Sequence, residues 1–374
     1  MKVLFYVGYQ KEEWDGNTTK GLAGSEIAVQ QIAKHVSLFG YDVVVSGSVK
    51  HSGKIDGVDY CNLKHIHELH FNTFDIIVGT SYSHFALEFR EYTKARKIFW
   101  AHNTESHVWW KGNKIDDDLV GKIHSENHDY IDETVTLTKW HCKKWFDLYD
   151  WSTKTQSIIA NGIDKSTFVG HPPKVLNSFI WSSAIDRGLV DLLKNWPRIK
   201  DVLSDATLNV YWPAYSNEYS QMEWINEHKE TLESIGVTFH GSVDQQTLHR
   251  AMLESDFWCY LSDYEETYCI TALEMQYAKV LPIVAKVAGL KETVASGIIL
   301  DQSETMWDNL VQTLKQLSPS LKRFAKDKAH EWASKQTWSQ RSYDWKALFD
   351  KVLHEDFYKN KKQVLAEMRS RPIQ

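Results

Sequence analysis

The chain has 374 residues, of which 43% are hydrophobic and 25% charged, and a formal net charge of −6. This composition is typical of a globular protein with about two domains, and it disfavours broad electrostatic binding to nucleic acid. The four cysteines lack C-x-x-C spacing, and no apolar run reaches the ~18 residues of a membrane span. We therefore expect reduced thiols, no integral membrane segment and a cytoplasmic location, or the host cytoplasm if the protein is viral.

The N-terminal region predicts a Rossmann-like domain. A first strand is expected over residues 2–9, and a second over residues 42–46. Between them, apolar residues recur at helical spacing, at Ile27, Ile32 and Val36. Gly40 ends this helix. A strand-helix-strand opening with a glycine-containing turn is common to many nucleotide-binding folds, so it indicates the class without fixing the ligand.

Two further parallel strands are expected over residues 74–80 and 97–103, and His102 lies at the carboxyl end of the second. A single histidine in this position is more often structural than catalytic. The loop at residues 109–111 carries two tryptophans and a lysine. These residue types suit an acceptor cleft and a packed core equally well.

Three groups of potential metal ligands occur in the N-terminal half. They are the D-x-D at residues 116–118, the pair His124 and His128, and the cluster His65, His67 and His70. The first lies in a charged loop, the second lacks a third ligand, and the third has no predicted helix or strand to support it. We predict that none of them binds a metal ion.

The middle of the chain predicts a strand over residues 133–139 and a basic, tryptophan-bearing helix over 138–149. That helix suits an ordinary protein surface better than a membrane surface or a polyanion. Residues 155–164 predict a strand and then a tight turn with positive φ at Asn161 and Gly162. The polar, proline-bearing segment 169–177 is expected to be the domain boundary.

Beyond the boundary, the sequence predicts a strand over residues 178–184. Two further strands are expected over residues 208–214 and 237–243. The chain beyond residue 300 is expected to be helical.

Residues 257–292 carry the chemistry. The pattern predicts a buried strand, a polar loop, a helix and another strand, over residues 257–261, 262–266, 268–278 and 280–284. In a parallel sheet, this loop and the helix N-terminus lie at the edge where open α/β sheets bind ligands. Backbone N–H groups there attract a phosphate, and Glu274 inside the helix can accept hydrogen bonds from ribose hydroxyls. Glu266, before the helix, would face the group attached to the phosphate farther from the ribose. This arrangement suits a nucleotide sugar.

The E-x7-E spacing of Glu266 and Glu274 resembles that of retaining, family-4-type glycosyltransferases with the GT-B fold. The resemblance continues through Pro282 and the segment AGLKE at 288–292. The segment ETYCITALE (266–274) is similar to a variant subgroup of the family that includes viral and bacterial proteins. Other matching segments are AGSE (23–26), NGID (161–164), HGSV (240–243) and the closing segment 337–353. The resemblance covers most of the chain.

In the second domain, residues 185–196 resemble the family's K-G-x-x-x-L-L helix, with Arg187 in the position of the lysine. The resemblance implies that Arg187 pairs with the β-phosphate of the donor. The family has a second basic residue about five positions earlier, where this chain has Ser182. Thr267, Tyr268 and Cys269 would bind the donor at the helix start, although the family prefers glycine at the first and last of these positions. These departures leave the strength of the activity open.

In the first domain, the resemblance implies that Gly24 lets the backbone approach the donor phosphates, while Ala23 replaces the family's first glycine. It also implies that His102 lies close to the donor sugar. The predicted fold class is therefore α/β, of the GT-B type, with two Rossmann-like domains facing a cleft. The acceptor domain is expected over 1–168, the donor domain over 169–340, and C-terminal helices that cross back to the first domain over 341–374.

The predicted activity is glycosyl transfer with retention of the anomeric configuration, independent of metal ions and cofactors. Glu266 would contact the sugar or stabilise positive charge at its anomeric carbon. The expected donor is a UDP- or GDP-sugar. The acceptor is a glycan, a lipid-linked sugar, a small molecule or a modified DNA base. The alternatives are a weak or catalytically dead nucleotide-sugar-binding protein, a sugar-nucleotide epimerase, and a phosphorylase, for which no cofactor-lysine motif is present.

Overall fold

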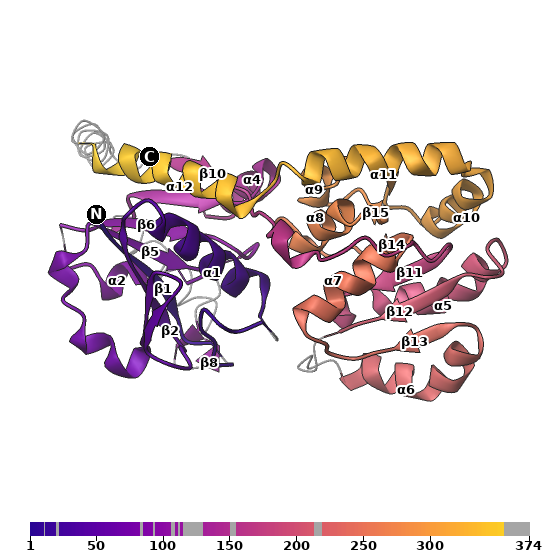
Figure 1. The fold of residues 1–374 in the computed structure, drawn as a ribbon, viewed down its shortest axis with the longest axis horizontal. Helices are drawn as coiled ribbons and strands as arrows, with labels where there is room; N and C mark the ends of the chain where they lie inside the picture. Colours follow the sequence, from indigo (N-terminus) through magenta and orange to yellow (C-terminus); the bar gives the residue numbers. More distant parts are fainter. Residues whose placement is uncertain are drawn as a thin grey trace, which may run out of the picture. The chain divides into compact units, whose positions relative to one another are not determined.

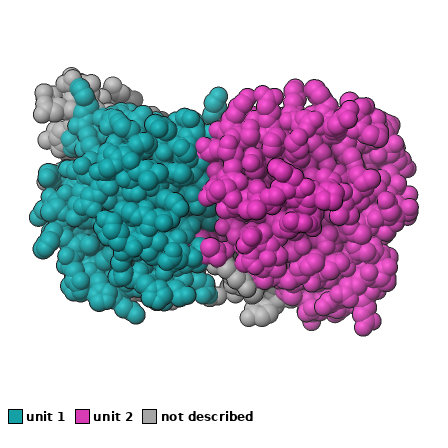
Figure 2. Space-filling view, in the orientation of Figure 1, with its two compact units in different colours: residues 1–18, 23–160, 338–374 teal, residues 19–22, 161–337 magenta. Residues whose placement is uncertain are grey.

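The computed structural model describes residues 1–354, apart from residues 11, 20–21, 83–84, 93, 106–108, 111–112, 115–129, 150–154 and 213–218. The chain divides into two compact units. The first comprises residues 1–18, 23–160 and 338–374, and the second comprises residues 19–22 and 161–337 (Figure 2). The assignment of one unit to the acceptor and the other to the donor stays a prediction.

The first unit contains an eight-stranded sheet in the order β10-β9-β6-β5-β1-β2-β4-β3, in which only β3 is antiparallel to its neighbour. Its strands are β1 (Lys2–Gly8), β2 (Asp42–Gly47), β3 (Gly53–Ile55), β4 (Val58–Asn62), β5 (Ile76–Thr80), β6 (Arg96–Trp100), β9 (Glu133–Thr136) and β10 (Gln156–Ile158). Its helices are α1 (Gly24–Ser37), α2 (Phe85–Glu88), α4 (Lys139–Tyr149) and α12 (Trp338–Leu353), with the short helices η1 (Leu63–Glu68) and η2 (Phe71–Thr73). A separate antiparallel pair is formed by β7 (Trp109–Trp110) and β8 (Asn113–Lys114).

The C-terminal helix α12 belongs to this first unit, where it packs against α1 (Figure 1). Its buried Trp345 makes edge contacts with the rings of Phe5 and Trp100, with centroids 6.2 Å and 4.7 Å away. Lys351 forms an ion pair of 3.0 Å with the buried Glu133. Apolar burial and a partly buried charge pair therefore both hold the end of the described chain on the first sheet.

The second unit contains a six-stranded, fully parallel sheet in the order β13-β12-β11-β14-β15-β16. Its strands are β11 (Ser178–Trp181), β12 (Thr207–Val210), β13 (Val237–Phe239), β14 (Phe257–Tyr260), β15 (Leu281–Ala285) and β16 (Ile298–Leu300). Its helices are α5 (Leu189–Lys200), α6 (Tyr219–Ser234), α7 (Gln245–Glu254), α8 (Ile270–Tyr277), α9 (Leu290–Thr293), α10 (Met306–Gln316) and α11 (Pro319–Ala333), with η4 (Lys165–Thr167) and η5 (Ile185–Arg187).

Both sheets have the strand order of doubly wound nucleotide-binding folds. In the second unit the chain runs outward from β11 to β13, crosses back to β14, and then runs outward in the other direction. The strand order therefore reverses between β11 and β14, and the crevice beyond the carboxyl ends of those two strands is where such sheets bind ligands. In the first unit the corresponding reversal lies between β1 and β5.

Half of the tryptophans are fully buried core residues. Of the sixteen in the sequence, eight are among the largest fully buried side chains: Trp14, Trp100, Trp145, Trp181, Trp196, Trp258, Trp338 and Trp345. Trp145 lies in α4 and is buried, so only Trp140 of the two tryptophans in that helix could contact a membrane surface.

The turn predicted at Asn161 and Gly162 is wrong. Neither residue has a positive φ. Instead, Ile163 forms a parallel β-bridge with Thr337, and its N–H donates to the carbonyl of Gln336 at 2.9 Å. The segment runs extended because it pairs with a distant part of the chain, a long-range contact that the local Asn-Gly signal does not reveal.

Candidate functional site

Glu266 and Glu274 lie at the carboxyl edge of the second sheet. The structure confirms the predicted strand, loop, helix and strand as β14, residues 261–269, α8 and β15. Glu266 lies in the loop that follows β14, and Glu274 is the fifth residue of α8. Since β14 is one of the two strands at which the order reverses, the loop after it lies at the edge where doubly wound sheets bind ligands.

The side chain of Glu266 is held by Tyr260, the last residue of β14. The phenolic hydroxyl of Tyr260 donates a hydrogen bond of 2.6 Å to Oε1 of Glu266. Burial raises the pKa of the Glu266 carboxyl above its usual value, and the Tyr260 hydroxyl and the positive charge of Arg187 only partly oppose this effect. A carboxylate that is desolvated and near a cation is a typical feature of a functional site.

The backbone of Glu266 is fixed by Gly289, which precedes α9. The N–H of Gly289 donates to the Glu266 carbonyl at 2.8 Å. A Cβ atom on Gly289 would lie 2.6 Å from the carbonyl oxygens of both Glu266 and Thr267. Glycine is therefore required at residue 289 for this close approach, which explains the AGLKE segment that the sequence singled out.

Arg187 lies beyond the carboxyl end of β11, on the other side of the strand-order reversal. The helix predicted over 185–196 is wrong at its start, because residues 185–187 form η5 and α5 begins at Leu189. Gly188 separates them with φ of 102°, a left-handed conformation that favours glycine. A Cβ on Gly188 would meet the backbone and side chain of Ser262 at 3.5–3.6 Å, so the two loops that flank the reversal pack on each other.

The guanidinium of Arg187 is already oriented. It donates a hydrogen bond of 2.8 Å to Asp186, and its central carbon lies 3.3 Å from the ring centroid of Tyr264. The side chain keeps 26% of its surface exposed. Stacking on an aromatic face leaves the in-plane N–H groups of arginine able to bind an anion bidentately, which suits a phosphate.

The start of α8 combines a glycine-like backbone with larger side chains. Cys269 precedes the helix with φ of 68° and makes no side-chain capping bond. Tyr268 is buried, whereas Thr267 is half-buried. Burial, followed by the charge of Glu266, raises the pKa of the Cys269 thiol well above its usual value, so the group stays a neutral thiol. The conformation that places backbone N–H groups at the helix start is thus kept without glycine.

Glu274 has a partner that the sequence did not indicate. Nε2 of His249, in α7, lies 3.3 Å from Oε1 of Glu274. The imidazole is buried and stacks on Phe168, with ring centroids 4.2 Å apart and planes at 16°. His249 is 25 positions from Glu274 in sequence and has no motif around it. Only the packing of α7 against α8 brings the two together.

His102 and Gly24 belong to the first unit. His102 lies two residues after β6 and is largely buried, and its ring centroid is 4.5 Å from that of Trp100. Burial, assisted by the neighbouring His141, lowers the pKa of His102 to about 3, so its imidazole is neutral. Gly24 is the exposed first residue of α1, at the carboxyl side of β1, and Ala23 precedes it as the N-cap.

The loop that carries His102 is held by α4. The Asn103 carbonyl accepts hydrogen bonds from Nε2 of His141 at 2.9 Å and from the indole N–H of Trp145 at 2.8 Å. The N–H of Leu137 donates to Nδ1 of His141, which fixes the tautomer. Burial lowers the pKa of His141 to about 4. This neutral histidine supports the loop, and the sequence reasoning missed it.

Several other sequence predictions concern potential ligands. Residues 111, 116–118, 124 and 128 lie outside the described residues, as do the side chains of residues 109 and 110. His65 and His67 lie in η1, so the expectation that this cluster has no helical support is wrong, and His65 contacts Glu68 at 2.9 Å. In the part of the chain that the structure describes, no group of three or more His, Cys, Asp or Glu side chains is placed to hold a metal ion.

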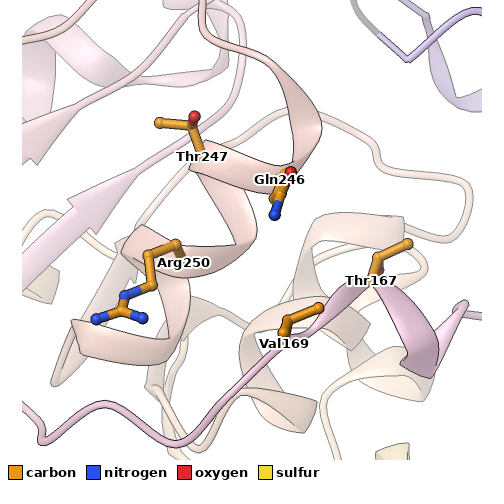
Figure 3. Close-up of a pocket in the computed structure, with 5 residues that line it drawn as sticks. All are labelled: Thr167, Val169, Gln246, Thr247 and Arg250. Carbon is orange, nitrogen blue, oxygen red and sulfur yellow. The ribbon is translucent and has the colours of Figure 1, made fainter.

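A pocket of about 370 Å³ lies between η4 and α7 in the second unit (Figure 3). Its lining residues are Thr167, Val169, Gln246, Thr247 and Arg250. Arg250 is paired with Glu254. The Thr167 hydroxyl donates to the main-chain carbonyl of Asp164, and the Thr247 hydroxyl donates to the carboxylate of Asp244. None of the predicted site residues lines the pocket. Phe168 and His249, each adjacent in sequence to lining residues, stack on each other, and His249 contacts Glu274.

None of the helices in the described residues has the length and apolarity needed to cross a membrane. None of the four cysteines forms a disulfide.

Comparison with solved structures identifies the fold. Sucrose-phosphate synthase from Thermosynechococcus elongatus matches with a TM-score of 0.73 at 13% identity, over 94% of this chain and 98% of that one. A glycosyltransferase from Rickettsia africae gives 0.70 at 13% identity, over 95% and 99% of the two chains. HepE from Anabaena, in complex with UDP and glucose, gives 0.68 at 12% identity, over 94% and 99%. No curated protein matches the chain in sequence.

The two Rossmann-like units, each with a mostly or fully parallel sheet, have the GT-B fold. Residues 182–331, which contain Arg187, Glu266 and Glu274, match the model of the family described as glycosyl transferases group 1. The family match and the fold together support a glycosyltransferase.

Proposed function

We propose that this chain transfers a glycosyl group from a nucleotide sugar to an acceptor with retention of the anomeric configuration, as family-4-type enzymes do. The observation that carries the proposal is the placement of Arg187 and Glu266 beyond β11 and β14, the two strands at which the order of the second sheet reverses. Arg187 supplies a cation, Glu266 an incompletely compensated carboxylate, and α8 a helix N-terminus beside them.

Each residue has a proposed role in this reaction. Arg187 binds the diphosphate, and the backbone of residues 267–269 adds N–H donors. Glu274 accepts hydrogen bonds from the ribose hydroxyls while His249 holds one of its oxygens. Glu266 stabilises the positive charge that develops at the anomeric carbon as the bond to the leaving phosphate breaks.

The first unit contributes Gly24 and His102 in this proposal. Gly24 leaves room for the donor phosphates next to the start of α1. His102, neutral because it is buried, donates or accepts a hydrogen bond at the donor sugar. The donor is a UDP- or GDP-sugar; the structural neighbour HepE forms a complex with UDP-glucose. The acceptor is a glycan, a lipid-linked sugar, a small molecule or a modified DNA base.

We further propose that the reaction needs no metal ion or cofactor and takes place in the cytoplasm, where cysteines without disulfides are usual. The expected outcome is transfer in excess chelator, with a product that keeps the donor's anomeric configuration, read by NMR of the anomeric proton. An inverted product, or activity that chelation abolishes and a divalent cation restores, would contradict the proposed mechanism.

Glu274 provides the test of donor binding. Glu274→Ala should weaken the binding of the free nucleoside diphosphate, because it removes the acceptor for the ribose hydroxyls. Calorimetry with UDP and GDP measures this, and Glu233→Ala on α6, which breaks an exposed pair with Lys229, is the matched control. Glu274→Gln keeps the size and one acceptor oxygen and should bind with intermediate affinity. Unchanged affinity in a folded Glu274→Ala protein would remove the ribose role.

A second candidate function is binding of a nucleotide sugar with weak or no catalysis. It is favoured by Ser182, which stands where the resemblance implies a second cation, and by Cys269 and Thr267 in place of glycines. The hydroxyl oxygen of Ser182 is buried and has no hydrogen-bond partner among the described residues. Donor hydrolysis separates the two functions, because a dead protein binds the donor without releasing the nucleoside diphosphate.

A further inference from the structure

Tyr260 occupies an unusually constrained position at the end of β14. Its side chain is fully buried. Its ring stacks between Trp181 and Trp258, with centroid distances of 5.4 Å and 5.0 Å and interplanar angles of 27° and 23°. Two stacking partners on the same sheet leave the ring little freedom to rotate or shift, because buried aromatic side chains pack at close to crystal density. The hydroxyl at its end is therefore a fixed point.

That fixed hydroxyl is bonded to the carboxylate proposed to act at the anomeric carbon. The 2.6 Å distance between the Tyr260 hydroxyl and Oε1 of Glu266 lies in the range of charge-assisted O–H···O⁻ bonds. Among the described residues, Tyr260 is the only side chain that donates a hydrogen bond to Glu266. The bond engages Oε1, which leaves Oε2 as the oxygen for a ligand.

The main chain of Glu266 is restrained independently. Gly289 donates its N–H to the Glu266 carbonyl and has no space for a side chain at that contact. The backbone is thus held from α9 and the carboxylate from β14. With both ends fixed, the side chain has one orientation before any ligand arrives, which is the preorganisation that electrostatic catalysis requires.

We propose that Tyr260 is a positioning residue for Glu266: its hydroxyl holds the carboxylate in one orientation, so that Oε2 is presented to the donor sugar. This inference rests on the proposed function, because it assigns a supporting partner to the same site. A tyrosine that served packing only would need no acceptor at this distance, and phenylalanine would fill the same space between the two indoles.

The other charged and titratable groups around Glu266 set the direction of the effect. Arg187 and Asp186 act on Glu266 from η5. The charge of Glu266 in turn raises the pKa of Cys269, before α8, and that of Tyr264, in the loop after β14. Burial raises the pKa of Glu266, the Tyr260 hydroxyl and Arg187 lower it, and Asp186 raises it. Removing the hydroxyl leaves burial less opposed, so the pKa of Glu266 should rise further.

The test is Tyr260→Phe, which deletes the hydroxyl and keeps the ring stack. We expect kcat to fall about 10-fold or more, the size expected for loss of a hydrogen bond to a charged group, while KM for the donor changes less than about 2-fold. The acid limb of the kcat–pH profile should move to higher pH, because a larger fraction of Glu266 is protonated at a given pH. Tyr60→Phe, which removes another buried tyrosine hydroxyl in β4 of the first unit, is the matched control and should change neither quantity.

Two further measurements keep the outcome decisive. Carbon NMR of labelled glutamate carboxyls should show a higher pKa for Glu266 in Tyr260→Phe, a readout that needs no turnover. In Glu266→Asp, which withdraws the carboxylate from the hydroxyl, adding Tyr260→Phe should lower kcat no further, because the hydrogen bond is already lost. An unchanged pH profile and an unchanged Glu266 pKa in Tyr260→Phe, with Glu266→Gln still impaired, would overturn the role of Tyr260 alone. Full turnover in Glu266→Gln would instead overturn the proposed function.

Discussion

Two carboxylates, the buried Asp256 and the half-buried Glu266, stand at opposite ends of the same strand, and their surroundings differ completely. Asp256 precedes β14, and its side chain accepts hydrogen bonds from Lys326, from Lys322 at 2.7 Å and from the N–H of Asn177 at 3.0 Å. Glu266 follows β14 and accepts from one neutral hydroxyl. Burial raises the pKa of Asp256, but the bonds from the two lysines outweigh it and hold the pKa below its usual value, whereas the pKa of Glu266 stays raised.

The difference separates a carboxylate whose charge is compensated within the protein from one that is compensated only in part. A carboxylate with two lysines and a backbone N–H has its desolvation compensated inside the protein. A carboxylate left with a phenol and a partly exposed arginine is compensated only in part, and a ligand can complete the compensation. The amino end of β14 therefore stabilises the second unit, and the carboxyl end is where chemistry is expected.

Asp256 should show the largest effect on stability. Asp256→Asn leaves Lys322 and Lys326 without their counterion, and removing one partner of a buried pair costs about 3–5 kcal/mol. Chemical denaturation measures this, with Asp308→Asn, which breaks the exposed pair with Arg198, as a control worth less than about 1 kcal/mol. Because the folded-state pKa of Asp256 is lowered, this stabilisation is present above the unfolded-state pKa and is lost as the pH falls through the folded-state value. Equal losses of stability in Asp256→Asn and Asp308→Asn would mean that Asp256 is not the structural charge proposed here.

Glu266 should show the opposite profile. Glu266→Gln should lower turnover on the order of 10²-fold, as expected when one preorganised electrostatic group is lost, with little change in donor affinity. Its Tm at neutral or higher pH should equal or exceed that of the native chain, because a raised pKa means that the charged carboxylate opposes folding there. Thermal melts and steady-state kinetics on the same preparation give both numbers. A large drop in Tm would show that Glu266, like Asp256, mainly stabilises the fold.

Arg187 should show the smallest effect of the three. Arg187→Ala should cost about 1.5–3 kcal/mol in binding a nucleoside diphosphate, the range for hydrogen bonds to charged groups. The loss should shrink for the nucleoside without phosphates. Arg198→Ala on the neighbouring α5 provides a control, since its partners are Asn195 and Asp308 on the surface. Equal losses for nucleoside and nucleotide would mean that Arg187 supports the loop through Asp186 and Tyr264 instead of binding phosphate.

The sequence predicted the region from β14 to β15 closely, because short apolar runs bounded by polar residues are local signals. It placed Glu266 before a helix and Glu274 inside it, as the structure does. It did not predict the break before α5, since a helical pattern continues through Gly188 until the backbone there turns left-handed. Propensity shows where a helix can form, but α5 begins only after the left-handed backbone of Gly188.

The hydrogen-bond partners of Glu266 and Glu274 could not be predicted from the sequence, for a different reason. Tyr260 lies in an apolar run and looks like any core residue, and its hydroxyl matters only because the loop returns over the strand end. His249 is on another helix, and a lone histidine carries no signal of its own. Such second partners arise from tertiary packing, so a single sequence contains no pattern that identifies them.

The adjacent residues Ala288 and Gly289, at the start of α9, should differ in how much substitution they tolerate. Ala288 keeps φ of 44°, a conformation that glycine adopts more easily, so this chain already tolerates a methyl group there. Gly289 lies against two carbonyl oxygens, and even one added carbon would push the loop that carries Glu266 away from the sheet. In a saturation library selected for activity, position 288 should accept glycine and other small residues, whereas every active variant should keep glycine at position 289.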